Sequence, residues 1–193
     1  MVTKKYKVLF FSKESRGGVG TFLKQIVHLN KKKFILKFYL YKKDPFCGLK
    51  KNLIIINKSY EQDEKPSMQK ILVFIKNVLL SFRIFVREDA DCIFTSDLYS
   101  SIIALLIKKI LLRRIKVVIL INTNLIKVIR RKKGSVYRFF LLSLIKNLYS
   151  FADQIIFVSH GLNKYLTRIL KLKKERVLTI YNGLDLNLVQ NKA

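Results

Sequence analysis

The sequence has no tryptophan and only two cysteines, two histidines and two prolines among its 193 residues. Cys47 and Cys92 stand far apart, with no CxxC pair, so neither the spacing nor the number of ligands suits a Cys/His zinc site. We therefore expect no metal in this protein. Two isolated cysteines also suit a reducing compartment better than a disulfide-stabilised secreted domain.

Long uninterrupted apolar runs are missing as well. The two most apolar stretches, residues 71–86 and 98–112, are interrupted by the basic residues Lys76, Arg83, Lys108 and Lys109. A membrane-spanning helix needs about 20 consecutive apolar residues. The apolar run near the amino terminus, residues 8–11, is too short for the core of a signal peptide. We expect a cytoplasmic protein, either free or peripheral on the inner face of the membrane.

Acidic residues are scarce, with 12 Asp and Glu against 39 Lys and Arg, which gives a formal net charge of +27. A charge of this sign attracts anions such as nucleic acid, acidic lipid headgroups or nucleotide phosphates. Because the basic residues are spread along the whole chain, a generally Lys-rich solvated surface explains the charge equally well. Half of the residues are hydrophobic, so the chain can bury a substantial core as one domain or two small ones.

Short apolar runs alternate with helical patterns along the chain. The expected strands are 6–12, 34–41, 53–57, 91–96, 116–121, 155–158 and 177–181. The expected helices are 21–29, 67–87, 98–112, 135–151 and 162–170, with 125–133 a basic loop or short helix. This alternation predicts an α/β fold, a Rossmann-like, doubly wound, mainly parallel sheet of about seven strands with helices on both faces.

A glycine-rich turn follows the first strand and precedes a helix. It contains Gly17, Gly18, Val19 and Gly20. Such a turn aims backbone N–H groups at the carboxyl edge of the sheet, where a phosphate or a sugar hydroxyl can bind, although glycines also serve simply to make a tight turn. The turn does not match a dinucleotide-binding fingerprint, because Leu23 stands where the last glycine of that motif is needed. It does not match a P-loop either, because the lysine of that motif is missing.

The last third of the chain forms a strand–helix–strand unit with polar residues after each strand. Ser159 and His160 follow the first strand, and Asn182 and Gly183 follow the second. Open α/β sheets bind ligands at the carboxyl ends of their strands. Ser159 also suits a helix N-cap, Asn182-Gly183 is a common turn pair, and His160 also suits an ordinary surface position.

These two blocks resemble family 4 glycosyltransferases of the two-domain GT-B architecture. The opening strand with Gly-Gly-Val-Gly is similar to the start of that family. The stretch from Ala152-Asp153 through Val158-Ser159 to Asn182-Gly183-Leu184-Asp185 is similar to its more specific motif. The resemblance covers residues from about 6 to 185. It implies an amino-terminal domain over 1–185, the start of an interdomain linker over 186–193, and no second domain in this chain.

The resemblance also implies where the site lies. The glycine turn would approach the donor phosphate or the acceptor, with Asp97 and Asn122 lining the acceptor side. Ser159 and His160 would face the same cleft, and Asn182-Gly183 would mark the crossing into a second domain. No cofactor is implied, because the nucleotide-sugar is itself a substrate.

The chain departs from the family in two ways. Many relatives carry a histidine where this chain has Asn122, and others near Phe94 and Ser96. An asparagine can donate and accept hydrogen bonds but cannot exchange a proton near neutral pH. The E-x7-E motif of the family's second domain is also missing from this chain.

The resemblance implies the acceptor-binding half of a glycosyltransferase, which would move a sugar from a nucleotide-sugar to a lipid-linked or polysaccharide acceptor. We expect it to be inactive without a donor-binding domain, supplied by a separate polypeptide or missing from a truncated product. A non-catalytic sugar-binding or scaffolding relative is an alternative. A nucleic-acid-binding module is a weaker one, because no helix-turn-helix, RNP or zinc pattern is present.

One basic segment is a candidate for contact with an anionic membrane surface. It contains Lys127, Arg130, Arg131, Lys132 and Lys133. Apolar residues lie beside them in the sequence: Leu125, Ile126, Val128 and Ile129. An ordinary solvated basic surface is the alternative.

Overall fold

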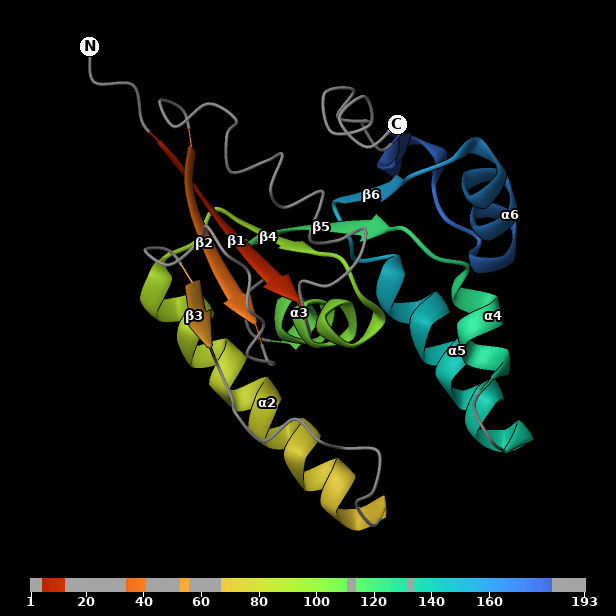
Figure 1. Ribbon diagram of the computed structural model, residues 1–193, viewed down its shortest axis with the longest axis horizontal. Coiled ribbons are helices and arrows are strands. Elements are labelled where there is room, and N and C mark those ends of the chain that lie inside the picture. The colour runs from red at the N-terminus through yellow and green to blue at the C-terminus, as the bar shows by residue number, and fades with distance from the viewer. Residues whose placement is uncertain are drawn as a thin grey trace, which may run out of the picture.

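A seven-stranded sheet forms the centre of the computed structural model, which describes residues 5–12, 34–40, 53–55, 67–110, 114–131 and 134–181 (Figure 1). Every neighbouring pair of strands is parallel, in the order β3-β2-β1-β4-β5-β6-β7. The strands are β1 (Tyr6–Ser12), β2 (Phe34–Leu40), β3 (Leu53–Ile55), β4 (Cys92–Thr95), β5 (Lys116–Ile121), β6 (Gln154–Phe157) and β7 (Val177–Thr179).

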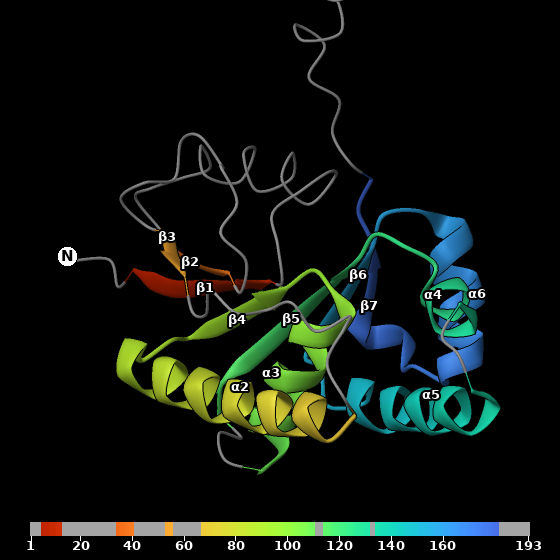
Figure 2. The ribbon, with the colours of Figure 1, turned by 60° about the horizontal axis from the view of Figure 1, so that its bottom comes forward.

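Helices connect the strands from β3 onward. They are α2 (Ser67–Glu88), α3 (Leu98–Ile110), α4 (Leu125–Arg130), α5 (Ser135–Tyr149), α6 (His160–Leu170) and the short 3₁₀ helix η1 (Lys174–Arg176). Figure 2 shows α2, α3 and α5 as one layer against a single face of the sheet. The helix expected over 21–29 lies outside the described residues.

The predicted fold class is confirmed. The strands expected over 6–12 and 116–121 have the expected bounds, and the others differ by one or a few residues at their ends. The basic segment after β5 includes a helix, α4, which ends at Arg130. The strand order reverses between β1 and β4, which creates the switch point where open α/β sheets bind ligands.

The main core lies between the sheet and the helix layer. Phe11, Ile93 and Phe157 point into it from the strands and are fully buried, as are Ile103 of α3 and Ile145 of α5. Full burial of side chains of this size contributes roughly 1.5–3 kcal/mol each. On the opposite face, the Phe10 ring packs on Phe38 and Phe94 with centroid distances of 5.0 and 4.9 Å. The sheet is therefore buried by apolar side chains on both faces, as a parallel sheet requires.

Two Ala-Asp pairs anchor the amino ends of the central strands. Asp91 precedes β4, and its carboxylate accepts a hydrogen bond from the Lys7 backbone N–H of β1 at 2.8 Å. Asp153 precedes β6, and its carboxylate accepts one from the Val117 N–H of β5 at 2.7 Å. The backbone N–H of each aspartate donates to the carbonyl of the same partner residue at 3.0 Å. The same device thus fixes the pairing of two different strand pairs.

Removing the Asp153 carboxylate is expected to destabilise the fold. Asp153→Ala leaves the Val117 N–H without its acceptor and breaks the ion pair with Lys108, so we expect a loss of about 1–3 kcal/mol. Asp153→Asn retains an acceptor oxygen and should lose less. Urea unfolding measures both. Asp89→Asn is the control, because it removes only an exposed ion pair with Lys7, and it should change stability little.

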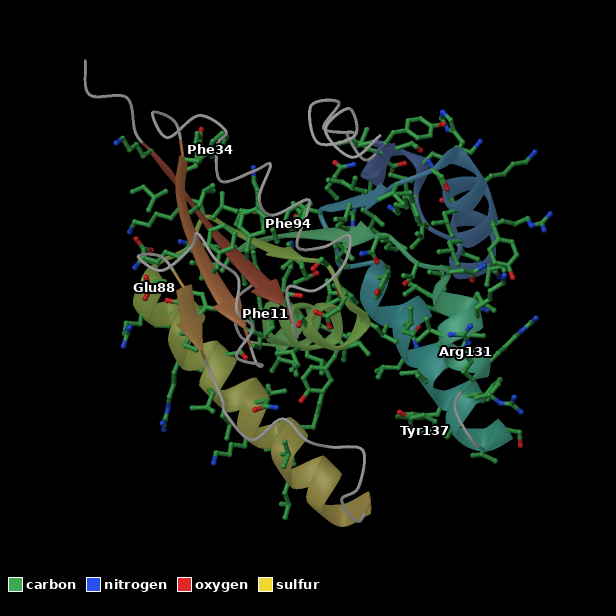
Figure 3. The ribbon with its side chains drawn as sticks, viewed as in Figure 1. Phe11, Phe34, Glu88, Phe94, Arg131 and Tyr137 are labelled. Carbon is green, nitrogen blue, oxygen red and sulfur yellow. The ribbon has the colours of Figure 1, made fainter. Side chains whose placement is uncertain are left out.

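A second ionic contact links β2 to the end of α2. Lys37 donates to the carboxylate of Glu88, whose side chain is only 8% exposed (Figure 3). The hydrogen bond from Lys37 holds the pKa of the Glu88 carboxyl below its ordinary value, against the opposing effect of burial. The folded structure therefore stabilises the ionised form of Glu88 relative to the unfolded chain.

This linkage predicts a pH-dependent contribution to stability. Because the pKa of Glu88 is lowered on folding, its contribution is present above the ordinary carboxyl pKa and is lost as the pH falls through the folded value. Glu88→Gln should cost about 1–3 kcal/mol at pH 7, and this difference should shrink toward pH 3. Urea titrations across that range measure it, with the exposed Glu175→Gln as control. A difference that stays constant with pH would contradict the role assigned to the Glu88 charge.

Candidate functional site

A pocket of about 280 Å³ lies at the carboxyl ends of β1, β4 and β5, beside the strand-order switch point. The amino-terminal ends of α3 and α4 form its sides, and polar groups from the strand ends open into it. Its lining is Ser12, Ser96, Asp97, Leu98, Ser101, Ile119, Leu120, Ile121, Asn122, Thr123, Leu125, Val128 and Tyr149. Asp97 and Asn122, both predicted from the sequence as site residues, are thereby brought together.

A chain of hydrogen bonds connects the ends of β1 and β4. The Ser96 hydroxyl donates to the Ser12 hydroxyl at 3.1 Å, and the Ser12 hydroxyl donates to Asp97 Oδ2 at 3.0 Å. Ser12 and Ser96 are buried, whereas Asp97 is partly exposed. The carboxylate is therefore oriented from the protein side while part of it remains accessible from the pocket.

Asp97 is also the N-cap of α3. Its Oδ1 accepts from the Ser100 backbone N–H at 2.9 Å, and its carbonyl accepts from the Ser101 hydroxyl at 2.6 Å. A carboxylate at this position satisfies an otherwise unpaired N–H and interacts favourably with the positive end of the helix dipole. The same side chain thus starts the helix and lines the pocket.

The inner wall of the pocket is a buried hydroxyl cluster. Thr95 Oγ1 and Ser101 Oγ lie 2.8 Å apart, and Ser101 and Tyr149 both line the pocket. Burial raises the pKa of Tyr149, and the nearby Asp97 charge raises it further. The phenol is therefore neutral at physiological pH and acts as a hydrogen-bonding group.

Asn122 follows β5 at the mouth of the pocket and is partly exposed. Two residues later, Asn124 caps α4, because its Oδ1 accepts from the backbone N–H groups of Ile126 at 3.1 Å and Lys127 at 3.2 Å. With Asn124 performing the capping, Asn122 is positioned to present its amide to the pocket.

The residues after β6 lie outside the lining of this pocket. Ser159 caps α6 by accepting from the Leu162 N–H at 3.3 Å, which is the structural role the sequence left open. His160 is exposed at the first position of α6, and its ring meets Tyr181 edge-on at a centroid distance of 5.7 Å. Both still occupy the carboxyl edge of the sheet, one strand beyond Asn122.

Several of the predicted site residues lie outside the described residues. These are Gly17, Gly18, Val19, Gly20, Lys132, Lys133, Asn182 and Gly183. Their assignments to the cleft, the basic segment and the domain crossing stay predictions.

The contact of the basic segment with a membrane stays a prediction, and the structure describes three of its five basic residues. Lys127, Arg130 and Arg131 are exposed, as expected. However, Ile126 and Ile129 are 8% and 4% exposed and belong to the core, as does Leu125 of the pocket lining, so these apolar residues cannot face lipid. The six residues of α4 are amphipathic, and the helix turns its apolar side toward α5 and the sheet.

Burial raises the pKa of the Cys92 thiol to about 11, and the Asp153 charge adds to the effect, so Cys92 is not a thiolate nucleophile at neutral pH. In the described part of the chain, no three His, Cys, Asp or Glu side chains are grouped as metal ligands would be. Nor does any helix in that part have the length and apolar character needed to cross a membrane.

Ser12, Ser96 and Tyr149 also line the pocket, although the sequence did not predict them as site residues. Ser12 and Ser96 each end or follow a predicted strand, so the rule that ligands bind at carboxyl strand ends could have found them. Tyr149 comes from the last turn of a helix distant in sequence, and no local pattern indicates that it reaches the pocket.

The fold and the pocket place this chain among Rossmann-like proteins with a site at the carboxyl edge of a parallel sheet. The model of Glycosyltransferase Family 4 matches residues 54–188. The chain therefore belongs to glycosyltransferase family 4, which confirms the family resemblance seen in the sequence. The matched range contains the Ala152–Asp185 motif, while the glycine-rich turn precedes it.

Solved structures share the fold across about half of their own length. A lipopolysaccharide outer core galactosyltransferase, WaaB in its apo form, has a TM-score of 0.68 and 14% identity, covering 92% of this chain and 46% of that one. The sucrose-phosphate synthase of Thermosynechococcus elongatus has a TM-score of 0.68 and 15% identity, with 96% and 50% covered.

A third similar structure is an α-glucosyltransferase in complex with UDP and a 13-mer DNA. It has a TM-score of 0.55 and 13% identity, with 98% of this chain and 45% of that one covered. No curated protein matches the chain in sequence. The chain thus spans about half the length of the solved structures it resembles.

The two roles of Asp97 predict a graded response to substitution. Asp97→Ala removes the cap of α3 and the acceptor for Ser12, so we expect a loss of about 1–2 kcal/mol. Asp97→Asn keeps an oxygen for the Ser100 N–H and should lose less than half as much. Thermal unfolding measures both, with the single-cap variant Ser159→Ala for comparison. Equal losses for Asn and Ala at position 97 would contradict the capping geometry.

Proposed function

We propose that this chain supplies the acceptor-binding half of a glycosyltransferase, which transfers a sugar from a nucleotide-sugar to a lipid-linked or polysaccharide acceptor. The observation that supports this most directly is the pocket where Asp97 and Asn122 meet at the switch point of a family 4 chain. Sugar hydroxyls are recognised by carboxylate, amide and hydroxyl groups of this kind. A galactosyltransferase and an α-glucosyltransferase among the similar structures have the same fold.

The donor-binding half is proposed to lie on a second domain. In this proposal residues 1–185 form one domain, and 186–193 begin a linker to the donor domain, which is either a separate polypeptide or part of a longer product. Two domains must close on the donor, because the sugar has to be held in line and shielded from water. This chain alone is then inactive. The nucleotide-sugar is the substrate, with no further cofactor, and UDP in one neighbour is consistent with that class.

Its place in the cell is proposed to be the cytoplasm, with peripheral attachment to the inner face of the membrane. A lipid-linked acceptor would be presented there, and the net charge of +27 favours an anionic surface. A non-catalytic sugar-binding or scaffolding relative is the second candidate. DNA is a further acceptor class to include, because one neighbour binds it, although at 13% identity only the fold is shared.

The first experiment determines the size of the native product. Immunoblotting and intact mass spectrometry from the native cell should give either a product near 22.7 kDa or one of about twice that size. The smaller product is followed by a pull-down for the donor-domain partner. The larger product supplies that domain directly.

The proposed role of Asn122 is tested in the complete enzyme. With the donor domain present, Asn122→Ala should reduce kcat/KM for the acceptor by about tenfold or more, because loss of one or two hydrogen bonds to the acceptor costs at least about 1.4 kcal/mol. The apparent affinity for the nucleotide-sugar should remain unchanged. Glu175→Gln, on η1 and away from the pocket, is the control. An equal loss on the donor side, or no loss at all, would argue against acceptor binding at this pocket.

A further inference from the structure

The first two turns of α5 carry apolar side chains that face solvent. Val136 is 82% exposed, Phe139 76%, Phe140 63% and Tyr137 52%. We call these four residues the α5 apolar patch. The exposed side of the helix becomes polar further along, at Ser143, Lys146 and Asn147, while Leu141, Ile145 and Leu148 pack into the core. The apolar surface is therefore confined to the amino-terminal half of a helix whose other side is firmly packed.

Exposure on this scale is unfavourable without a partner. Two phenyl rings and a valine on adjacent turns form a contiguous apolar surface, which marks an interaction site more often than an ordinary solvated helix does. The described residues of the chain itself leave this surface open, as the exposed fractions show. A partner that supplies an apolar environment would remove these rings from water.

Exposed cations lie on the helix next to the α5 apolar patch. The short helix α4 packs against α5 and exposes Lys127, Arg130 and Arg131. Arg138 of α5 donates to the Arg130 carbonyl at 3.5 Å, which links the two helices. Figure 3 shows Arg131 and Tyr137 on this same side of the molecule, with Phe34 at the opposite corner.

The sequence around this surface is basic throughout. Between Asp97 and Asp153 the chain contains no aspartate or glutamate, although lysines and arginines recur along the whole interval. A partner must therefore be anionic where it meets α4 and apolar where it meets α5. An acidic lipid bilayer provides both, with charged headgroups above a hydrocarbon phase. DNA offers phosphates but no apolar phase to receive the phenyl rings of Phe139 and Phe140.

We propose that the α5 apolar patch inserts into the headgroup–acyl boundary of an anionic membrane, with α4 supplying the electrostatic contacts. This deepens the proposed function by naming the docking element of its membrane partner, and it holds whether or not the sugar-transfer proposal does. The charge comes from α4, and the inserted apolar residues come from α5. The packing of the two helices joins these contributions on one surface.

The absence of tryptophan allows a direct test of insertion. Phe139→Trp introduces the sole tryptophan into the full-length chain, and Phe34→Trp is the matched control, since Phe34 is also an exposed phenylalanine but lies at the opposite corner. Vesicles of phosphatidylcholine with about 30–40% phosphatidylglycerol, an anionic content that attracts basic segments, are compared with pure phosphatidylcholine. The indole emission of Phe139→Trp should shift to shorter wavelength and be quenched by brominated acyl chains with the anionic vesicles only. The emission of Phe34→Trp should not change.

Three further variants separate insertion from simple charge attraction. Phe139→Ser with Phe140→Ser should weaken vesicle partitioning by about tenfold or more, while Arg130→Gln and Arg131→Gln should each weaken it by about fivefold. Circular dichroism confirms that each variant is folded. Vesicle binding by Phe139→Trp without quenching of its indole would overturn insertion and leave electrostatic adsorption. Binding to a DNA duplex with no vesicle binding would overturn the proposal entirely.

The vesicle assay contains no nucleotide-sugar and no donor domain. Failure of membrane docking therefore appears as unquenched emission from Phe139→Trp, whereas failure of the proposed function appears as unchanged acceptor kinetics in Asn122→Ala. The two results are independent.

Discussion

The parallel pairing of the strands is the constraint on which the rest of this structure depends. Parallel strands place all their carboxyl ends at one edge of the sheet, so polar residues that end β1, β4 and β5 meet even though they are far apart in sequence. The carboxylates of Asp91 and Asp153 fix this pairing at the amino ends by binding the backbone of the neighbouring strand. The Asp91 carboxylate holds β1 in register with β4, so Ser12 and Ser96 end side by side, and the parallel pairing of β4 with β5 brings Asn122 to the same pocket.

The same edge is where the helices begin, and this imposes two demands on its polar residues. The first N–H groups of each helix need acceptors, and Asp97, Asn124 and Ser159 supply them for α3, α4 and α6. A polar side chain at this edge is available to bind a ligand only if it is not fully occupied in capping a helix. Asn122 meets this condition because Asn124 caps the helix, and Asp97 serves both demands because its two oxygens point to different partners.

The packing of the helices decides which of the many basic side chains lie together on one surface. A net charge of +27 attracts any anion, and the even spread of lysines along the sequence identifies no surface. Folding buries the apolar side of α4 and leaves its cations exposed beside the solvent-facing rings of α5. A basic surface with an adjoining apolar patch is far more selective for one kind of partner than charge alone, since both contacts must be satisfied together.

The sequence by itself determined the fold class, the alternation of strands and helices and the family. Short β-branched runs and the Ala152–Asp185 motif are local patterns, and the preferences they express act between near neighbours. Only the tertiary structure decided that Ser101 and Tyr149 complete the wall of the pocket, and that Leu125, Ile126 and Ile129 belong to the core. These outcomes depend on which faces of helices meet. Helix packing is set by contacts between residues distant in sequence, so no local pattern can encode it.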